Sequence, residues 1–446
     1  MKRKTTLLAL LMSVAMIGSV LAGCSSDIKN SVAETTTAVT TTTALTTTTA
    51  ETTTTTAETT TTTAATTTAA TTKATTKATT KATTAATTAA TAAATTAATT
   101  AATTATQTVT GSATKYVYNT LTAEEKTVYD EIVAAIKAYK TSVTFSAAHD
   151  GALVTKIYQD VFYQEPSLFW FMATTATYSG STTSIQLDYR YSQSEVATMQ
   201  PKLDAAVSAI VTKAGGNGAS ALAKLTALHD YVINKTTFSK DANEAKCAYG
   251  PLVGTYGQCE GYAKATAYFC DKVGIPNVRV TGLNDKQLTH AWNKVQVNGK
   301  WYNIDLTFDD PTGETPLLVH NYMLVPDSQI NGVSHFPDSA PFGAFPAANS
   351  LDSNYFVANG LYVNNANDAV AKLQTLMTNA TGSKLSAVEV KCDSKATLDA
   401  VKAILVDQAQ VLTLKDKANA ASTNKISKVK YDVNSHTLVF RVNLIY

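Results

Sequence analysis

The sequence predicts an α+β fold with a helix followed by an antiparallel hairpin, and with α/β segments on either side. Three observations point to it. A helix is expected over residues 259–273, because Gly274 and Pro276 follow its last apolar position. A hairpin is expected next, because Asn298-Gly299 is the strongest short signal for a two-residue type I′ turn. The Thr/Ala-rich composition of residues 25–114 separates this folded part from the N-terminus.

Residues 1–24 have the pattern of an export signal. Three basic residues precede an apolar run at 7–21, which ends in Leu21-Ala22-Gly23-Cys24. This tetrad resembles the bacterial lipobox, whose cysteine is lipidated and becomes the mature N-terminus. The apolar run is shorter than the roughly 20 residues of a spanning helix. We therefore expect a lipid anchor at Cys24, on the extracellular face of a bacterial membrane. An ordinary cleaved signal peptide is the alternative.

Residues 25–114 are predicted to be a disordered linker. From about Ser31 they are almost entirely Thr and Ala, with no apolar period and no aromatic side chain. Nothing in such a segment offsets the entropy of ordering it. We expect it to act as a stalk between the lipid anchor and the folded part. The formal net charge of +2 provides no basic field for nucleic acid, which we exclude as a partner.

Two accessory domains are predicted on either side of the central segment, an α+β domain at 115–215 and an α/β domain at 350–446. In the first, a capping box at Thr122 and Glu125 begins a helix. His149 is isolated there and is interpreted as a surface or capping histidine. The other expected elements are a strand at 185–191, helices at 193–213, 368–377 and 396–408, an extended segment at 355–363, and strands at 388–390, 426–432 and 437–444.

The sequence contains five cysteines, Cys24 included, which is few for a disulfide framework. We expect free thiols in the folded part, with Cys270 in the core. Cys392 and His436 have no companions at metal-ligand spacing, so neither a metal site nor a cofactor is predicted. The free thiols are expected at Cys247, Cys259, Cys270 and Cys392.

The central domain, residues 216–345, begins with a predicted helix at 220–233. His229 and Asp230 lie near the end of this helix. An acid–base pair is one interpretation of them. Adjacent residues do not share a helix face, however, so we interpret both as structural.

The register of the predicted hairpin brings a histidine and an aspartate together. Its strands are expected over 289–297 and 300–307, and a two-residue turn pairs Val297 with Lys300. Trp292 then faces Asp305, and His290 faces Thr307. His290 and Asp305 become diagonal neighbours on one face, with backbones roughly 7–8 Å apart. A slip of one residue would separate them. The other face is expected to be apolar and to pack on the core, with Val295, Val297, Tyr302, Ile304 and Leu306.

Cys259, His290 and Asp305 together have the composition of a nucleophile, a base and an orienting group. A helix N-terminus favours a thiolate at Cys259, and protonated His290 can stabilise it. Asp305 would orient the imidazole, although Asp309 and Asp310 are alternatives for that role. The backbone N–H of Cys259 is an expected oxyanion donor. The second donor is left open between Gln258 and the Tyr256 hydroxyl, and Trp292 is expected to shield the site or to line an acyl groove.

Four segments resemble the bacterial transglutaminase-like superfamily, and they occur in its order and spacing: residues 257–263, 274–276, 289–293 and 301–307. The resemblance extends over about 220–325 and implies a papain-like fold for the central domain. It also implies that the family's catalytic residues correspond to Cys259, His290 and Asp305. The family includes protein cross-linkers, amidases, peptidases and inactive scaffolds, so membership alone does not define the reaction.

The expected function is therefore that of a surface-anchored thiol enzyme acting on amide bonds of a protein or peptide. Cys259 would form a thioester, which water or a second amine would resolve. Cell-wall peptides are an alternative substrate. A non-catalytic binding or adhesion module on a stalk is the competing hypothesis.

Overall fold

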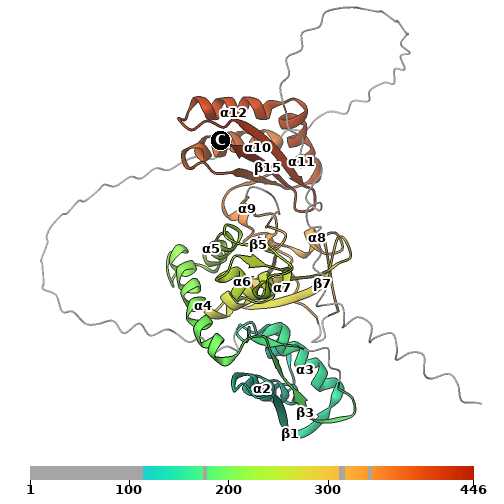
Figure 1. Ribbon diagram of the computed structural model, residues 1–446. Helices are drawn as coiled ribbons and strands as arrows, with labels where there is room; N and C mark the ends of the chain where they lie inside the picture. The colour runs from blue at the N-terminus through green and yellow to red at the C-terminus, as the bar shows by residue number, and fades with distance from the viewer. Residues whose placement is uncertain (1–113, 174–177, 311–316, 340–343) are drawn as a thin grey trace, which may run out of the picture. The chain divides into compact units, whose positions relative to one another are not determined.

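The structure of the chain is a computed structural model that describes residues 114–173, 178–310, 317–339 and 344–446 (Figure 1). The predicted export signal and almost all of the predicted linker lie outside the described residues. Among the described residues, no helix is both long and apolar enough to cross a membrane. Two large hydrophobic cores are present, one built from residues between 117 and 324 and the other from residues between 363 and 444.

The N-terminal segment contains two helices that begin where the sequence predicts. The Thr122 side chain accepts from the Glu125 N–H, and the Glu125 carboxylate accepts from the Thr122 N–H, which confirms the capping box. His149 is buried and bonded to Glu124 (Nδ1 to Oε1, 3.0 Å), so a surface position was the wrong expectation. The elements are α1 (Tyr116–Thr120), α2 (Ala123–Lys137), β1 (Ser142–Asp150), α3 (Gly151–Gln164), β2 (Phe171–Met172), β3 (Ser181–Gln186), β4 (Asp188–Tyr189) and α4 (Gln193–Lys213).

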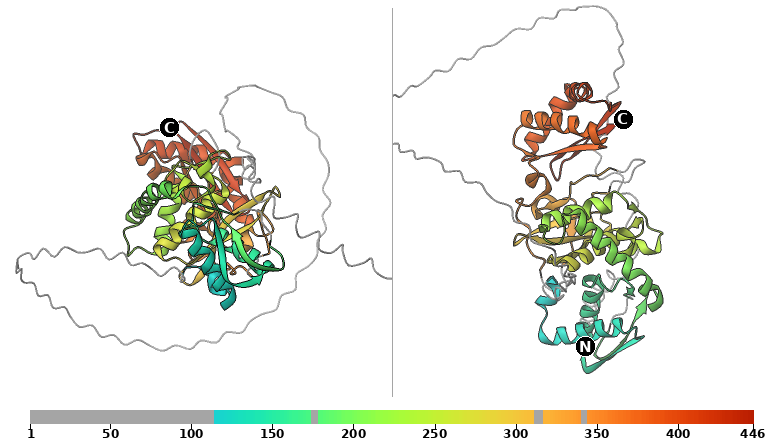
Figure 2. Two further views of the ribbon diagram at one scale, coloured as in Figure 1. Left: turned by 60° about the horizontal axis from the view of Figure 1, so that its bottom comes forward. Right: turned by 90° about the vertical axis from the view of Figure 1, so that its left-hand side faces the viewer.

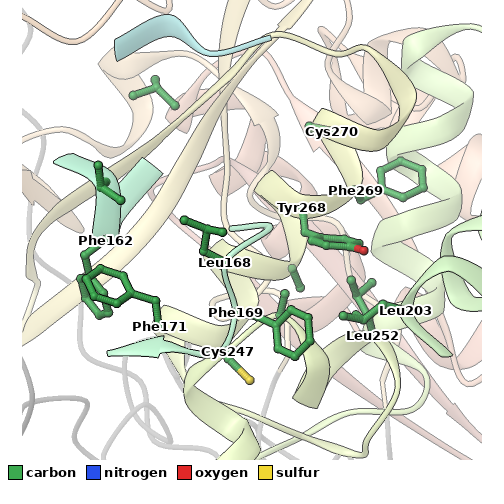
Figure 3. Close-up of a cluster of buried hydrophobic side chains, with 14 of the residues drawn as sticks. Phe162, Leu168, Phe169, Phe171, Leu203, Cys247, Leu252, Tyr268, Phe269 and Cys270 are labelled. Carbon is green, nitrogen blue, oxygen red and sulfur yellow. The ribbon is translucent and has the colours of Figure 1, made fainter. Parts of the chain in front are cut away.

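This segment and the central one share one hydrophobic core. Figure 3 shows part of it, where Phe162, Phe169 and Phe171 of the first segment belong to the same cluster as Tyr268 and Phe269 of the second. The predicted boundary at 215/216 stays a prediction. The central elements up to α7 are α5 (Ala221–Ile233), β5 (Thr237–Phe238), the 3₁₀ helix η2 (Asn243–Lys246), α6 (Tyr249–Leu252), β6 (Tyr256–Gly257) and α7 (Cys259–Val273) itself.

Helix α7 ends as predicted, with Gly274 in the left-handed region at φ 79°. It packs tightly against the preceding chain, because a Cβ on Gly261 would lie 2.0 Å from the carbonyl oxygen of Ala245. On its other side it packs on strand β8, where the Asn293 amide donates to the carbonyl of Ala263 (3.0 Å). The fold is thus α+β, with a helix packed on an antiparallel sheet, which confirms the predicted fold class.

The sheet beneath α7 has five strands in the order β10-β9-β8-β7-β11, and every neighbouring pair is antiparallel. The turn at Asn298-Gly299 has positive φ at both residues, as a type I′ turn requires. Residues 317–337 supply the two outer strands, which the sequence did not predict. The strands are β7 (Asn277–Asn284), β8 (Thr289–Val297), β9 (Lys300–Ile304), β10 (Met323–Val325) and β11 (His335–Pro337), with helix α8 (Asp327–Ile330) between the last two.

The hairpin register is as predicted from Val297↔Lys300 to Asn293↔Ile304. Strand β9 ends there, three residues earlier than expected, so the predicted pairs of His290 with Thr307 and of Trp292 with Asp305 are wrong. The cause is a side-chain turn. The Asp305 Oδ1 accepts from the N–H groups of Thr307 (2.8 Å) and Phe308 (3.1 Å), which curls the chain out of the sheet. The predicted apolar face is buried, with Val295, Val297, Tyr302, Ile304 and Leu306 in the core.

The C-terminal segment forms a sheet in the order β12-β13-β15-β14, with α10 and α12 packed on it and on each other (Figures 1 and 2). The extended segment expected at 355–363 is wrong in its first half. Asn354 caps a short helix there by accepting from Phe356 N–H. Helix α12 was not predicted. The elements are α9 (Tyr355–Ala358), β12 (Tyr362–Val363), α10 (Ala366–Ser383), β13 (Ala387–Cys392), α11 (Lys395–Lys402), the π-helical η3 (Ala403–Asp407), α12 (Gln410–Ala420), β14 (Lys428–Asn434) and β15 (Val439–Ile445).

Three of the cysteines in the described part are buried free thiols, as expected: Cys247, Cys270 and Cys392. Burial raises the pKa of the Cys270 thiol well above its ordinary value. Cys259 is not among these free thiols, so the expectation of a free thiol is not borne out at that position.

Candidate active site

His290 and Asp305 lie in direct contact. His290 Nε2 is 2.6 Å from Asp305 Oδ2, and each residue is 2% exposed. His290 and Asp305 are in contact although β9 ends before Asp305, because the turn at Asp305 directs Oδ2 back toward strand β8. A carboxylate only accepts, so His290 must carry its proton on Nε2. Nδ1 is then the nitrogen that can exchange a proton with a third group.

Asp305 is held as a carboxylate. Burial acts to raise its pKa, but the charge of protonated His290 and the hydrogen bonds from His290 and His335 hold that pKa well below its ordinary range. The two backbone donors to Oδ1 act in the same direction. Asp305 is therefore a buried, ionised acceptor.

His335 is a residue of this site that sequence reasoning missed. Its Nε2 lies 2.8 Å from the same Asp305 Oδ2 that contacts His290. It reaches Asp305 from β11, where it pairs with Asn284 of β7. No short spacing marks it, because it follows Asp305 by 30 residues and lies on a strand of only three residues.

An aromatic shell encloses the two histidines. The Trp292 ring stacks near His290 (centroids 5.8 Å apart, planes at 18°), and Phe308 meets His290 edge-on at 4.9 Å. Tyr322 adds a third ring beside His335. Trp292 is 1% exposed, and its indole N–H donates to Asn303 (3.2 Å). Shielding, rather than an open acyl groove, is the role that this burial favours for Trp292.

Cys259 is the first residue of α7 and is buried. Helix α7 packs on strand β8, and the hydrogen bond between Asn293 and Ala263 marks a point of contact between them. Cys259 lies about one helical turn before Ala263, and His290 lies three strand residues before Asn293. Cys259 and His290 therefore belong to elements that face each other. Gln258, at the helix cap, is 8% exposed, whereas Tyr256 is 43% exposed. Burial next to Cys259 makes Gln258 the better placed of the two candidates for an inward-facing donor.

The two other aspartates proposed to orient His290 have different partners. Asp309 lies 3.2 Å from His229 Nε2 and accepts from the Tyr322 N–H (3.0 Å). Asp310 accepts a short hydrogen bond from the Tyr262 hydroxyl on α7. Burial raises the pKa of Asp310 to about 6. The three aspartates thus attach the loop after β9 to three different elements.

A second cluster of histidines and carboxylates surrounds Asp230. Its Oδ1 lies 3.2 Å from His229 Nδ1 and 3.1 Å from His320 Nε2. The argument that adjacent helix residues cannot pair was wrong here, because the short Asp230 side chain curls back to the ring. His320 Nδ1 also contacts Glu389 (3.2 Å). Burial opposes protonation of His320, but these two carboxylates raise its pKa to about 9.

Within the described residues, two groups have three side chains that could hold a metal ion: His290, Asp305 and His335, and His229, Asp230 and His320. In the first group both histidines bond one carboxylate oxygen at hydrogen-bond distance. In the second, His229 Nδ1 and His320 Nε2 likewise lie at hydrogen-bond distance from one oxygen, Asp230 Oδ1, and the two imidazoles stack (4.8 Å, 25°). Both geometries are those of hydrogen-bonded networks.

Comparison with known proteins gives a family match within the middle of the chain. Residues 208–306 match the sequence profile of the transglutaminase-like superfamily. Over 168 residues the chain is 24% identical to kyphoscoliosis peptidase of Mus musculus, and the match covers 31% of this chain and 25% of that protein. The chain thus spans about a quarter of the length of this relative.

Among solved structures, the chain is similar to a TGase (17% identity, TM-score 0.24, covering 35% of this chain and 48% of the other). It is also similar to the periplasmic domain of TgpA from Pseudomonas aeruginosa (20% identity, TM-score 0.20, covering 30% and 58%). Similarity at this level adds nothing to the sequence match. The part of the chain that contains α7 and the β8–β9 hairpin belongs to the transglutaminase-like superfamily.

Proposed function

We propose that the chain is a thiol enzyme that cleaves or transfers acyl groups at amide bonds, with Cys259, His290 and Asp305 as its triad. The observation that carries the proposal is the buried His290–Asp305 pair on the sheet, opposite the helix that opens with Cys259. The superfamily match supports the reaction class.

The reactive form of Cys259 is the reduced thiol. The thiol proton passes to Nδ1 of His290, and the thiolate attacks the amide carbonyl carbon. The resulting oxyanion accepts from the Cys259 N–H at the start of α7. Collapse of this intermediate breaks the C–N bond as the imidazolium protonates the leaving amine, and a thioester remains.

The thioester is then resolved by a second nucleophile. His290 takes a proton from water or from an amine as it attacks the thioester carbonyl. The C–S bond breaks, Cys259 recovers its proton, and the product is a carboxylic acid or a new amide. Asp305 keeps the His290 proton on Nε2 throughout, so that Nδ1 is available for both transfers.

The proposed substrate is a protein or peptide, with cell-wall peptides as one class to test. We further propose that lipidated Cys24 anchors the enzyme to the extracellular face of the membrane. Both proposals come from the sequence motifs, and each needs its own measurement: product masses for the substrate, and mass spectrometry of the mature N-terminus for the anchor.

The test uses the reduced full chain and iodoacetamide, with Cys259 labelling followed by peptide mass spectrometry. We expect Cys259 to react at pH 6 at least 10-fold faster than a model thiol, and His290→Ala to abolish the excess. His436→Ala, a histidine outside the site, is the matched control. Equal rates in wild type and His290→Ala would end the proposal. A peptide library with a labelled primary amine then separates hydrolysis from acyl transfer by product mass.

A further inference from the structure

Two histidines compete for one oxygen in the candidate active site. Asp305 Oδ2 lies 2.6 Å from His290 Nε2 and 2.8 Å from His335 Nε2. Because a carboxylate only accepts, both imidazoles must carry their protons on Nε2. The negative charge at this oxygen is therefore divided between two donors, of which only His290 lies on the element facing Cys259.

The chain also determines the proton state of His335. Its Nδ1 lies 2.8 Å from Ser334 Oγ. With Nε2 protonated, Nδ1 of a neutral ring can only accept, so the Ser334 hydroxyl donates to it. His335 is 0% exposed, and this burial lowers its pKa below the ordinary histidine value. His335 is thus a neutral donor with a defined tautomer.

Among the described residues, Asp305 is the one carboxylate in contact with His335. The titratable groups that face it are Asp305, His290, Asp285 and Tyr322. Of these, Asp305 is the hydrogen-bonded carboxylate, and the remaining walls are the rings of Trp292 and Phe308.

We propose that His335 is a positioning residue for Asp305: its Nε2–H bonds the same Oδ2 and so weakens the stabilisation that Asp305 gives to the protonated ring of His290. This rests on the proposed function. The effect matters in the first half of the reaction, where the imidazolium must give up its Nδ1 proton to the leaving amine. Without His335, Asp305 would bond His290 alone and stabilise the imidazolium more strongly.

The test measures the proton on His290 without needing the substrate. Reduced Cys259 is alkylated with iodoacetate, which is anionic, and with iodoacetamide, which is neutral. Both reagents react with the thiolate, so the rate with iodoacetate divided by the rate with iodoacetamide does not depend on the fraction of Cys259 that is ionised. An imidazolium next to the sulfur attracts the anion, so the ratio falls at the pH where the imidazole loses its proton.

The variants are chosen to keep volume and change one hydrogen bond. His335→Phe fills the space without a donor, and we expect the fall in the ratio to move to higher pH by about one pH unit. His335→Gln retains an N–H donor at a similar reach and should restore the wild-type profile. Ser334→Ala leaves the His335 ring in place but removes the hydrogen bond that selects its tautomer. In this variant the rate ratio should also fall at a higher pH than in wild type, but the shift should be smaller than in His335→Phe.

The outcomes separate the two proposals. A wild-type ratio that is flat with pH, and unchanged in His290→Ala, overturns the proposed function. A wild-type ratio that falls with pH, together with an unshifted His335→Phe profile, overturns only the role of His335. If His335→Phe fails to fold, as judged by its melting curve, an unshifted Ser334→Ala profile overturns it. A profile that changes on adding EDTA would indicate a metal at the three residues and would also overturn it.

Discussion

The two histidine clusters of this protein have the same components but opposite proton chemistry. Around Asp305, two histidines share one contacting carboxylate, so at most one of them is stabilised as an imidazolium. Around Asp230, two histidines contact three carboxylates: Asp230, Asp309 and Glu389. Burial is similar in both. The ratio of carboxylates to imidazoles, rather than burial, therefore decides whether a buried histidine is neutral or charged.

The consequence is a difference in function. A cluster with one carboxylate for two rings is only partly paired, so His290 can take up and release a proton at Nδ1. A cluster with three carboxylates for two rings is fully paired. It joins α5, the loop after β9 and strand β13. We interpret the first as the reactive cluster and the second as a structural one.

The largest expected effect comes from removing each central aspartate in turn. Asp305→Asn should lower the rate of amide turnover by about 10³–10⁴, because the amide can present its N–H to His290 and stabilise the wrong tautomer. Asp230→Asn is the matched control in the structural cluster and should leave turnover within about threefold. The measurement is kcat/KM on any peptide that the library assay identifies. A similar loss of kcat/KM in both variants would contradict the assignment of one cluster as reactive and the other as structural.

His320 should make the protein more stable in acid than in base. The pKa of His320 is raised from 6.5 to about 9. A raised pKa contributes stability that is complete below pH 6.5 and is lost as the pH rises through about 9. Each whole step in pKa is worth about 1.4 kcal/mol, so the full effect is about 3 kcal/mol. We expect the free energies of unfolding of wild type and His320→Gln to converge over this range.

The control for that measurement is His436→Gln, because this histidine lies outside the cluster. Urea unfolding at pH 6 and pH 9.5 is sufficient for each variant. A difference between wild type and His320→Gln that stays constant with pH would show that His320 contributes packing and not charge.

The effect of His335 on the pH dependence of stability should be opposite in sign to that of His320, and it should be the smallest of the predicted effects. Burial lowers its pKa, so the unfolded chain takes up a proton at this residue before the folded one does. Its contribution to stability is present above pH 6.5 and is lost as the pH falls below it. His335→Gln, which cannot titrate, should flatten the acid side of the stability curve between pH 7 and 5. An acid side as steep as that of wild type would indicate that His335 is protonated in the folded protein.

Local patterns predicted the parts of the site that are close in sequence. Gly274 after the last helical residue determined where α7 ends, and Asn298-Gly299 determined the register of the hairpin, because both depend on backbone conformations that few residues adopt. The end of β9 was missed because Asp305 acts twice, as a turn residue through Oδ1 and as the partner of His290 through Oδ2.

The second cluster was misjudged for a related reason. Helical geometry correctly places His229 and Asp230 on different faces, but it ignores the partners that other segments supply. His320 and Asp309 come from the chain beyond the hairpin and complete the pairing of Asp230 and His229. No spacing within α5 contains this information.

The sequence by itself determined the helix that opens with Cys259, the pairing of the two hairpin strands and hence which face carries His290, because turn and cap residues act on their immediate neighbours. Only the tertiary structure decided that His335 shares the Asp305 oxygen and that His320 reaches Asp230. Those contacts join residues 30 and 90 positions apart, and they depend on how short edge strands and loops dock on the sheet. Such docking reflects the summed packing of many side chains, which no local pattern encodes.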